Sequence, residues 1–181
     1  SVIQASEAAC IDGAFFIPKK DCADYRMIHD LRPVNAYCHE YPTSFDTLYS
    51  LAEVLLPEDW MVAFDLRHGY FCLSLHPRFR KYFCFRVNGV VYQWNVLPFG
   101  WVGSPATFQE FAQEVTKVLL KVLKGKTRAR TYLDDFLWMF RGYQAARSAV
   151  PVMQETLAAL GLESHPKKSD WEPSMIKRHL G

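Results

Sequence analysis

The feature that most constrains the fold is an Asn-Gly pair between two runs of β-forming residues. Asn88 and Gly89 separate the run FCFRV from the run VVYQWNV. A two-residue Asn-Gly connection favours a type I′ turn, which joins adjacent antiparallel strands. The pair therefore predicts a tight β-hairpin over residues 83–96.

Further strands are predicted on both sides of this hairpin. Residues 14–18 and 25–32 are rich in β-forming side chains and flank a polar turn, which indicates a β-ribbon with a basic tip. Residues 61–66 form a short apolar run with one acid, as a buried strand does when its end reaches a surface. The segment 130–140, RTYLDDFLWMF, predicts a second hairpin because an acidic pair favours a turn.

Two helices are predicted from apolar spacing on either side of these strands. The first covers residues 43–56, begins at a Thr or Ser cap and stops before Pro57. Its apolar residues follow helical spacing: Phe45, Leu48, Leu51 and Leu55. The second covers residues 143–160, and we expect Pro151 to kink or restart it.

The most complete helix signal lies between these two. Ser104 is the expected N-cap, Pro105 occupies the first helical position, and Gly125 follows the end. The expected apolar face consists of Phe108, Phe111, Val115, Leu119 and Val122. Because strands and helices mix without regular β-α alternation, the predicted fold class is α+β, with helices packed on one face of an antiparallel sheet.

The composition is that of a folded globular chain, with 50% hydrophobic residues, 22% charged residues and a net charge of +2. No apolar run approaches the roughly 20 residues needed to cross a bilayer, so we expect no membrane partner. Five scattered cysteines without zinc-type spacing indicate reduced thiols in an intracellular compartment, cytoplasmic or nuclear. The chain opens without an initiator Met or a signal-peptide pattern, and we expect it to be part of a longer protein.

Three acids stand in apolar strand contexts, where carboxylates are costly. They are Asp65 in VAFDL and the pair Asp134 and Asp135 in YLDDFLW. An antiparallel sheet can bring two such strand ends together, and clustered carboxylates then require a neutralising cation. Oxygen ligands suit Mg²⁺ or Mn²⁺, and two such ions promote phosphoryl displacement. The spacing alone leaves nucleotidyl transfer and phosphodiester hydrolysis open.

Ordered motifs along the chain decide between these reactions. FDLRHGYF, VLPFGWVGSPATFQ, YLDD, GLESHPKKS and a terminal HLG follow one another in that order. This series resembles the motifs of reverse transcriptases from retroviruses and LTR-type retrotransposons, over about residues 15–181. The resemblance implies an RNA-directed DNA polymerase that acts on a template, a primer and dNTPs. It also implies a polymerase palm plus fingers, with the thumb and ribonuclease H parts outside this chain.

The resemblance also implies subdomain bounds and catalytic roles. Fingers would cover about residues 1–60 and 77–100, and palm residues 61–76 and 101–181. Two metal ions would be held by four groups: the carboxylates of Asp65, Asp134 and Asp135 and the carbonyl of Leu66. Lys168 would protonate the departing pyrophosphate, with Lys167 as the alternative. We expect weak processive activity from this chain alone.

Nucleotide-binding residues follow from the same resemblance. Lys19 and Arg26 would clamp the phosphates of the incoming nucleotide, and backbone N–H groups of His68 and Gly69 would approach the triphosphate. Tyr70 would lie under the incoming sugar and exclude a 2′-hydroxyl by overlap.

Four further positions are implied around the template and sugar. Phe99 stands where retroviral enzymes commonly carry Gln and many retrotransposons carry Phe, which points to a retrotransposon-like origin. Phe99 remains a nucleotide-contact candidate. Gly100, Gln109 and Tyr132 are the expected template or primer contacts.

Three rival functions remain to be distinguished. An RNA-dependent RNA polymerase usually carries G-D-D and a polar residue in place of Tyr70, and this chain has neither feature. A catalytically inactive, nucleic-acid-binding descendant of a polymerase has little physical reason to retain three mutually repelling acids. A nuclease usually needs a His or Lys base beside its metals, and the matched motifs supply none.

Overall fold

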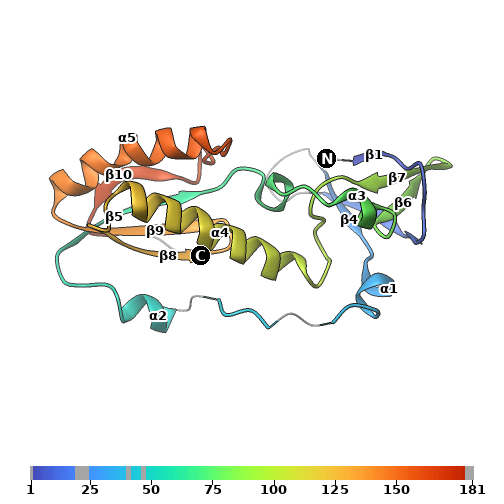
Figure 1. Cartoon of the computed structure of the whole chain (residues 1–181), viewed down its shortest axis with the longest axis horizontal. Helices are drawn as coiled ribbons and strands as arrows, with labels where there is room; N and C mark the ends of the chain where they lie inside the picture. The colour runs from blue at the N-terminus through green and yellow to red at the C-terminus, as the bar shows by residue number, and fades with distance from the viewer. Residues whose placement is uncertain (1, 19–24, 40–41, 46–47, 178–181) are drawn as a thin grey trace. The chain divides into compact units, whose positions relative to one another are not determined.

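The computed structural model describes residues 2–18, 25–39, 42–45 and 48–177 (Figure 1). The chain divides into two compact units. Unit 1 comprises Ser1–Pro42 and Tyr70–Ala106, and unit 2 comprises Thr43–Gly69 and Thr107–Gly181. In the part of the chain that is described, no helix is both long and apolar enough to cross a membrane.

The core of unit 2 is a four-stranded antiparallel sheet in the order β10-β5-β9-β8. Its strands are β5 (Asp59–Asp65), β8 (Arg128–Tyr132), β9 (Asp135–Arg141) and β10 (Asp170–Ser174). The central pair, β5 and β9, is in register without interruption from Asp59 opposite Arg141 to Asp65 opposite Asp135. The strand and hairpin predicted around residues 61–66 and 130–140 are therefore present.

One face of this sheet carries large apolar side chains and the two long helices. Alternate residues of β5 and β9 point to the same face. On this face Phe64 stacks on Phe136 with ring centroids 4.6 Å apart. Helix α4 (Ser104–Val122) reaches it through Thr116, whose hydroxyl lies 2.7 Å from that of Thr131 opposite Phe136. Helix α5 (Tyr143–Ala159) begins beside Trp60 of the same face, with ring centroids 5.0 Å apart. The predicted layer of helices on one face is confirmed for α4 and α5.

The opposite face is covered by a shorter helix than predicted. Met61, Ala63, Leu137 and Met139 form a buried cluster on this face, against which Leu51 and Val54 pack. Helix α2 spans only Leu48–Ala52, so the expected helix over residues 43–56 is wrong in length. Phe45, expected on that helix, is not helical, and its ring lies 5.5 Å from that of Tyr132.

The two long helices differ from expectation in three details. Ser104 does not cap α4 in the expected way, because its hydroxyl donates to the carbonyl of Pro98 at 2.6 Å. Val122 is 44% exposed, so the apolar face ends at Leu119, which is fully buried. Helix α5 continues through Pro151, whose side chain is exposed, with no break in the helical assignment.

Unit 1 contains a second four-stranded sheet, in the order β1-β7-β6-β2. Asn88 and Gly89 have φ of 49° and 80°, and they join β6 (Cys84–Val87) to β7 (Val90–Trp94) as the type I′ signature predicts. The outer strands β1 (Val2–Gln4) and β2 (Ile11–Asp12) were not predicted, and β2 pairs parallel with β6.

The predicted β-ribbon of unit 1 is present as a separate antiparallel pair. It consists of β3 (Ala14–Pro18) and β4 (Tyr25–His29), while its expected tip lies outside the described residues. The remaining short helices are α1 (Arg32–Asn35), η1 (Gly69–Cys72) and α3 (Pro77–Arg80). The α+β class is thus confirmed.

The units do not coincide with the bounds expected for fingers and palm. Residues 43–60, expected in the fingers, group with unit 2 because α2 packs on its sheet. Residues 70–76, expected in the palm, group with unit 1. There the N–H of Leu97 donates to the carbonyl of Leu73 at 2.9 Å and the N–H of Leu75 to that of Asn95 at 2.8 Å. Residues 101–106 also group with unit 1.

Candidate active site

The sheet of unit 2 gathers the three predicted acids at one end. Asp65, the last residue of β5, is the direct cross-strand partner of Asp135, the first residue of β9. Directly opposed residues carry their side chains on the same face, with Cβ atoms about 4.5–5.5 Å apart. Asp134 lies in the adjoining turn, and its carbonyl accepts from the N–H of Leu66 at 2.9 Å. Residues 69 positions apart in the sequence thus become neighbours.

The turn that carries Asp134 has an unusual backbone. Leu133 and Asp134 connect Tyr132 to Asp135, and Leu133 has φ of 52°. A two-residue hairpin turn with positive φ at its first central residue favours glycine there. A leucine in this conformation costs about 1–3 kcal/mol and persists only where its surroundings hold it.

The acids repel one another, and one lysine offsets part of this charge. Burial, and then the nearby charge of Asp65, raise the pKa of Asp134, and Asp135 adds to the rise. The charge of Lys168 acts in the opposite direction. The Lys168 ammonium lies 3.2 Å from a carboxylate oxygen of Asp65. Within the described ranges, no group of three or more His, Cys, Asp or Glu side chains is arranged to hold a metal ion.

A late segment of the chain fixes the backbone of Asp65. The N–H of His165 donates to the Asp65 carbonyl at 2.7 Å. The N–H of Asp65 donates to the hydroxyl of Ser169 at 3.2 Å. Lys168, which contacts the Asp65 carboxylate, lies between these two residues. The side chains of Lys167 and Lys168 are both exposed. Among the contacts of the described residues, Lys168 has an ion pair with an acid of the site, and Lys167 has none.

The loop after β5 runs beside the acids. His68 and Gly69 both have positive φ, 72° and 47°. A Cβ at Gly69 would lie 3.7 Å from a carboxylate oxygen of Asp134, which is ordinary contact. The loop therefore lies beside Asp134, and the positive φ explains the glycine.

Gln109 does not occupy the surface expected for a template contact. Its side chain is 1% exposed. Its amide nitrogen donates to the carbonyl of Thr131 at 2.8 Å, and its amide oxygen accepts from the N–H of Leu133 at 2.7 Å. The predicted role is wrong because both ends of the amide are used inside unit 2. Tyr132, between these two residues, is half-buried and packs beside Phe45.

Other predicted site residues lie in unit 1. The ring of Tyr70 is 4.8 Å from that of Phe99, which is 51% exposed. Phe71 also contacts Phe99, edge to face at 5.3 Å. Arg26 pairs with Ile17 through the ribbon backbone, and Lys19 lies outside the described residues.

A residue that the sequence did not single out holds the loop around Gly100. The Asn35 amide nitrogen donates to the Gly100 carbonyl at 2.9 Å, and the Asn35 amide oxygen accepts from the N–H of Val102 at 3.0 Å. Gly100 has φ of 93°, and a Cβ there would lie 3.4 Å from the carbonyl of His29. No local signal marks Asn35, because its partners are 65 and 67 residues away.

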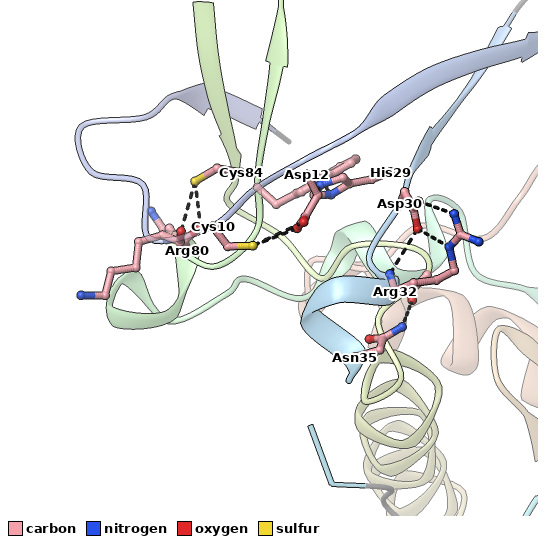
Figure 2. A network of polar contacts seen from close by, with 11 residues as sticks. Cys10, Asp12, His29, Asp30, Arg32, Asn35, Arg80 and Cys84 are labelled. Atoms are coloured by element: carbon pink, nitrogen blue, oxygen red, sulfur yellow. Dashed lines mark hydrogen bonds and ion pairs between the residues drawn. The ribbon is translucent and has the colours of Figure 1, made fainter. Parts of the chain in front are cut away.

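Figure 2 shows further polar contacts of unit 1, with Asp30, Arg32 and Asn35 at α1 and His29 at the end of β4. Arg32 makes two side-chain hydrogen bonds to Asp30, at 2.8 and 2.6 Å, and these lower the pKa of Asp30 to about 2. His29 accepts from the indole N–H of Trp94 at 3.1 Å. Burial lowers the pKa of His29, although Asp12 nearby opposes the shift. These contacts fix the end of β4, and α1 with Asn35 follows it after two residues.

Comparison with known proteins agrees with this geometry. The family model described as "Reverse transcriptase (RNA-dependent DNA polymerase)" matches residues 17–177. The chain belongs to the reverse transcriptase family. Its relatives include the Pol-related polyprotein of a mouse intracisternal A-particle, 29% identical over 84% of the chain. They also include the Gag-Pol polyprotein of walleye dermal sarcoma virus, 29% identical over 88% of the chain.

Solved structures show the same fold for this reverse transcriptase domain. Prototype foamy virus protease-reverse transcriptase matches 93% of the chain with a TM-score of 0.72 and 22% identity. The chain covers 22% of that protein, and it spans 18% and 9% of the two polyproteins above. The predicted family is confirmed, while the activity of a whole polyprotein remains to be argued for this chain.

Proposed function

We propose that the chain is the catalytic portion of an RNA-directed DNA polymerase, which transfers dNTPs to the 3′ end of a primer on an RNA or DNA template. The observation that carries this proposal is the register of β5 and β9, which sets Asp65 opposite Asp135 beside the turn that bears Asp134. Membership of the reverse transcriptase family supports the same reaction.

The three acids are the proposed ligands of two Mg²⁺ or Mn²⁺ ions, because carboxylate oxygens suit these cations. The raised pKa of Asp134, caused by burial and by the charge of Asp65, indicates excess negative charge that divalent cations would neutralise. Asp65, Asp134 and Asp135 would supply carboxylates, and Leu66 a carbonyl. Bound metal would lower the pKa of the attacking 3′-hydroxyl and stabilise the leaving oxygen. Cation binding at Asp65 competes with the ion pair to Lys168.

Lys168 is the proposed proton donor to pyrophosphate. Its ammonium reaches Asp65 while its side chain remains 60% exposed, so it can also meet a ligand at the acids. These contacts favour Lys168 over Lys167. An ammonium is protonated at neutral pH and can supply a proton to a developing oxyanion.

Unit 1 is proposed to select and hold the nucleotide. The contact between Tyr70 and Phe99 supports a shared aromatic surface for the sugar of a dNTP. The triphosphate clamp formed by Lys19 and Arg26, and the approach of the His68 and Gly69 backbone, remain predictions. Template or primer contacts at Gly100 and Tyr132 also remain predictions.

The biological setting is proposed from fewer observations. Phe99 favours a retrotransposon-like parent, and the thumb and ribonuclease H parts would come from the rest of a longer polyprotein. An intracellular site of action remains a prediction, made from five cysteines without zinc-type spacing.

Primer extension tests the proposal. The parent polypeptide is given an RNA template, a DNA primer, dNTPs and Mg²⁺, beside its Asp134→Asn and Glu114→Gln variants. Glu114 is a matched control because it lies on an exposed face of α4, where it pairs with Lys117. We expect extension by the parent and by Glu114→Gln, and none by Asp134→Asn. Equal extension by all three would refute the proposed role of the acids.

A further inference from the structure

The buried amide of Gln109 is built to hold the turn that carries the acidic pair. It bonds Thr131 on one side of Tyr132 and Leu133 on the other. One of these backbone groups is an acceptor and the other a donor, so only a side chain with both functions can satisfy them. The Gln109 side chain meets this requirement from α4: its amide nitrogen lies 2.8 Å from the Thr131 carbonyl oxygen, and its amide oxygen lies 2.7 Å from the Leu133 nitrogen.

The Gln109 bond acts at the residue with the least favourable backbone. Leu133 adopts φ of 52°, which a leucine rarely adopts without support. Its N–H is the group that Gln109 accepts from. On the far side of the turn, the Asp134 carbonyl is held by the N–H of Leu66. The backbone of the 133–134 turn is therefore held from α4 by the Gln109 side chain and from the residue after β5 by the N–H of Leu66.

We infer that Gln109 is a positioning residue, which holds the 133–134 turn so that Asp134 and Asp135 face Asp65. This inference rests on the proposed polymerase function. Gln109 touches no reacting group, so its effect on catalysis passes through the turn. Groups that orient metal ligands change metal affinity or activity by about 10- to 100-fold when removed.

The same helix and strand offer a control for a merely structural effect. The hydroxyls of Thr116 and Thr131 lie 2.7 Å apart, and Thr116 follows Gln109 by about two turns of α4. Thr116→Val removes this link between α4 and β8 and leaves the Leu133 contact intact. A variant that only loosens the packing of α4 on the sheet would therefore behave like Thr116→Val.

The test measures Mn²⁺ affinity of the full 181-residue chain, with folding checked by circular dichroism. Variants are Gln109→Met, which keeps the size and loses both hydrogen bonds, Gln109→Asn, which is too short to make both, and Thr116→Val. We expect about tenfold weaker Mn²⁺ binding for Gln109→Met, a smaller loss for Gln109→Asn, and less than about threefold for Thr116→Val. In the parent polypeptide, kcat should fall by about 10- to 100-fold in Gln109→Met, while KM for dNTP changes less than about threefold.

The outcomes separate this inference from the proposed function. Unchanged Mn²⁺ affinity in Asp134→Asn overturns the metal site, and the inference with it. Weaker binding in Asp134→Asn combined with wild-type affinity and kcat in Gln109→Met overturns the inference alone. If Gln109→Met does not fold, wild-type behaviour of folded Gln109→Asn overturns the inference in the same way. Equal losses in Thr116→Val and Gln109→Met also overturn it.

Discussion

In each unit a single side-chain amide holds one loop, and the two amides differ in burial. Asn35 in unit 1 bonds the backbone of Gly100 and Val102 at a half-buried position, while Gln109 in unit 2 bonds Thr131 and Leu133 at 1% exposure. The residue with positive φ in each loop also differs: it is Gly100 in unit 1 and Leu133 in unit 2. Water can replace an exposed hydrogen bond, but not a buried one. The acid-bearing turn therefore depends on its amide more than the Gly100 loop does.

The largest expected effect separates the roles of the two units. Asp65→Asn in the parent polypeptide should reduce primer extension by about 10³-fold, because metal ligands supply several kcal/mol of transition-state stabilisation. Tyr70→Ala should change dNTP incorporation by less than about tenfold but increase ribonucleotide incorporation, because a ring that excludes the 2′-hydroxyl is removed. Single-nucleotide incorporation with dNTP and rNTP measures both. The division of roles is wrong if Tyr70→Ala does not increase ribonucleotide incorporation, or if Asp65→Asn retains most of the activity.

The second prediction compares the two amides in stability. Gln109→Met should lower the free energy of unfolding by about 2–4 kcal/mol, since it leaves two buried backbone groups without their amide partner. Asn35→Ala should cost only about 1 kcal/mol, because solvent can reach the freed groups. Urea denaturation of the full chain measures both. Equal losses would show that burial does not distinguish the two loops.

The third prediction concerns the glycine of the exposed loop. Gly100→Ala should lower the free energy of unfolding by about 1–2 kcal/mol, because φ of 93° is unfavourable for a residue with a Cβ. The matched control is Gly13→Ala, since a Cβ at Gly13 would meet no atom within 4 Å. That control should be neutral or stabilising by up to about 1 kcal/mol. Thermal or urea denaturation that ranks the two variants in the reverse order would contradict this interpretation.

The smallest prediction uses the opposite pKa shifts of two acids. The raised pKa of Asp134 means that its charge destabilises the folded chain above that pKa, and this penalty disappears as the pH falls below its unfolded value. Asp134→Asn without metal should therefore raise Tm at pH 7 by about 2–4 °C, the shift that about 1 kcal/mol gives in a chain of this size. The gain should shrink as the pH falls through the raised pKa of Asp134 toward the value of an unfolded aspartate, about 3.9.

The pKa of Asp30 in unit 1 is shifted in the opposite direction from that of Asp134. Its pKa is lowered to about 2 by Arg32, so its charge stabilises the fold above its unfolded pKa, and this contribution is lost as the pH falls toward 2. Asp30→Asn should therefore lower Tm slightly at pH 7, because the pair is exposed. Two shifts of the same sign would contradict the opposite environments of these acids.

Local patterns predicted most of the fold, and contacts distant in sequence account for the failures. The Asn88-Gly89 turn, the β-ribbon and the acidic hairpin follow from neighbouring residues, and all three are present. The parallel pairing of β2 with β6 joins segments about 70 residues apart, which no local periodicity encodes. The helix expected over residues 43–56 spans only Leu48–Ala52, and Phe45 packs beside Tyr132, a contact that helical spacing cannot reveal.

The candidate site shows the same limit. Apolar strands that end in acids predicted the meeting of Asp65 with Asp134 and Asp135, because the strand period and an antiparallel sheet suffice for that inference. Gln109 was expected to contact the template or primer because of the resemblance to reverse transcriptases. Its burial depends on the backbone of a hairpin 22 to 24 residues further along the chain.

The position of β5 in its sheet has a consequence for the order of events during synthesis. Both neighbours of this apolar strand are encoded after it, since β9 begins at Asp135 and β10 ends at Ser174. At about 5–20 residues per second, a ribosome needs roughly 5–20 s to translate the intervening segment. β5 has two unpaired edges until β9 is made and one until β10 is made, and such edges are templates for association with other chains. Nascent polypeptides that stall within this interval should be the most prone to aggregate and to recruit chaperones.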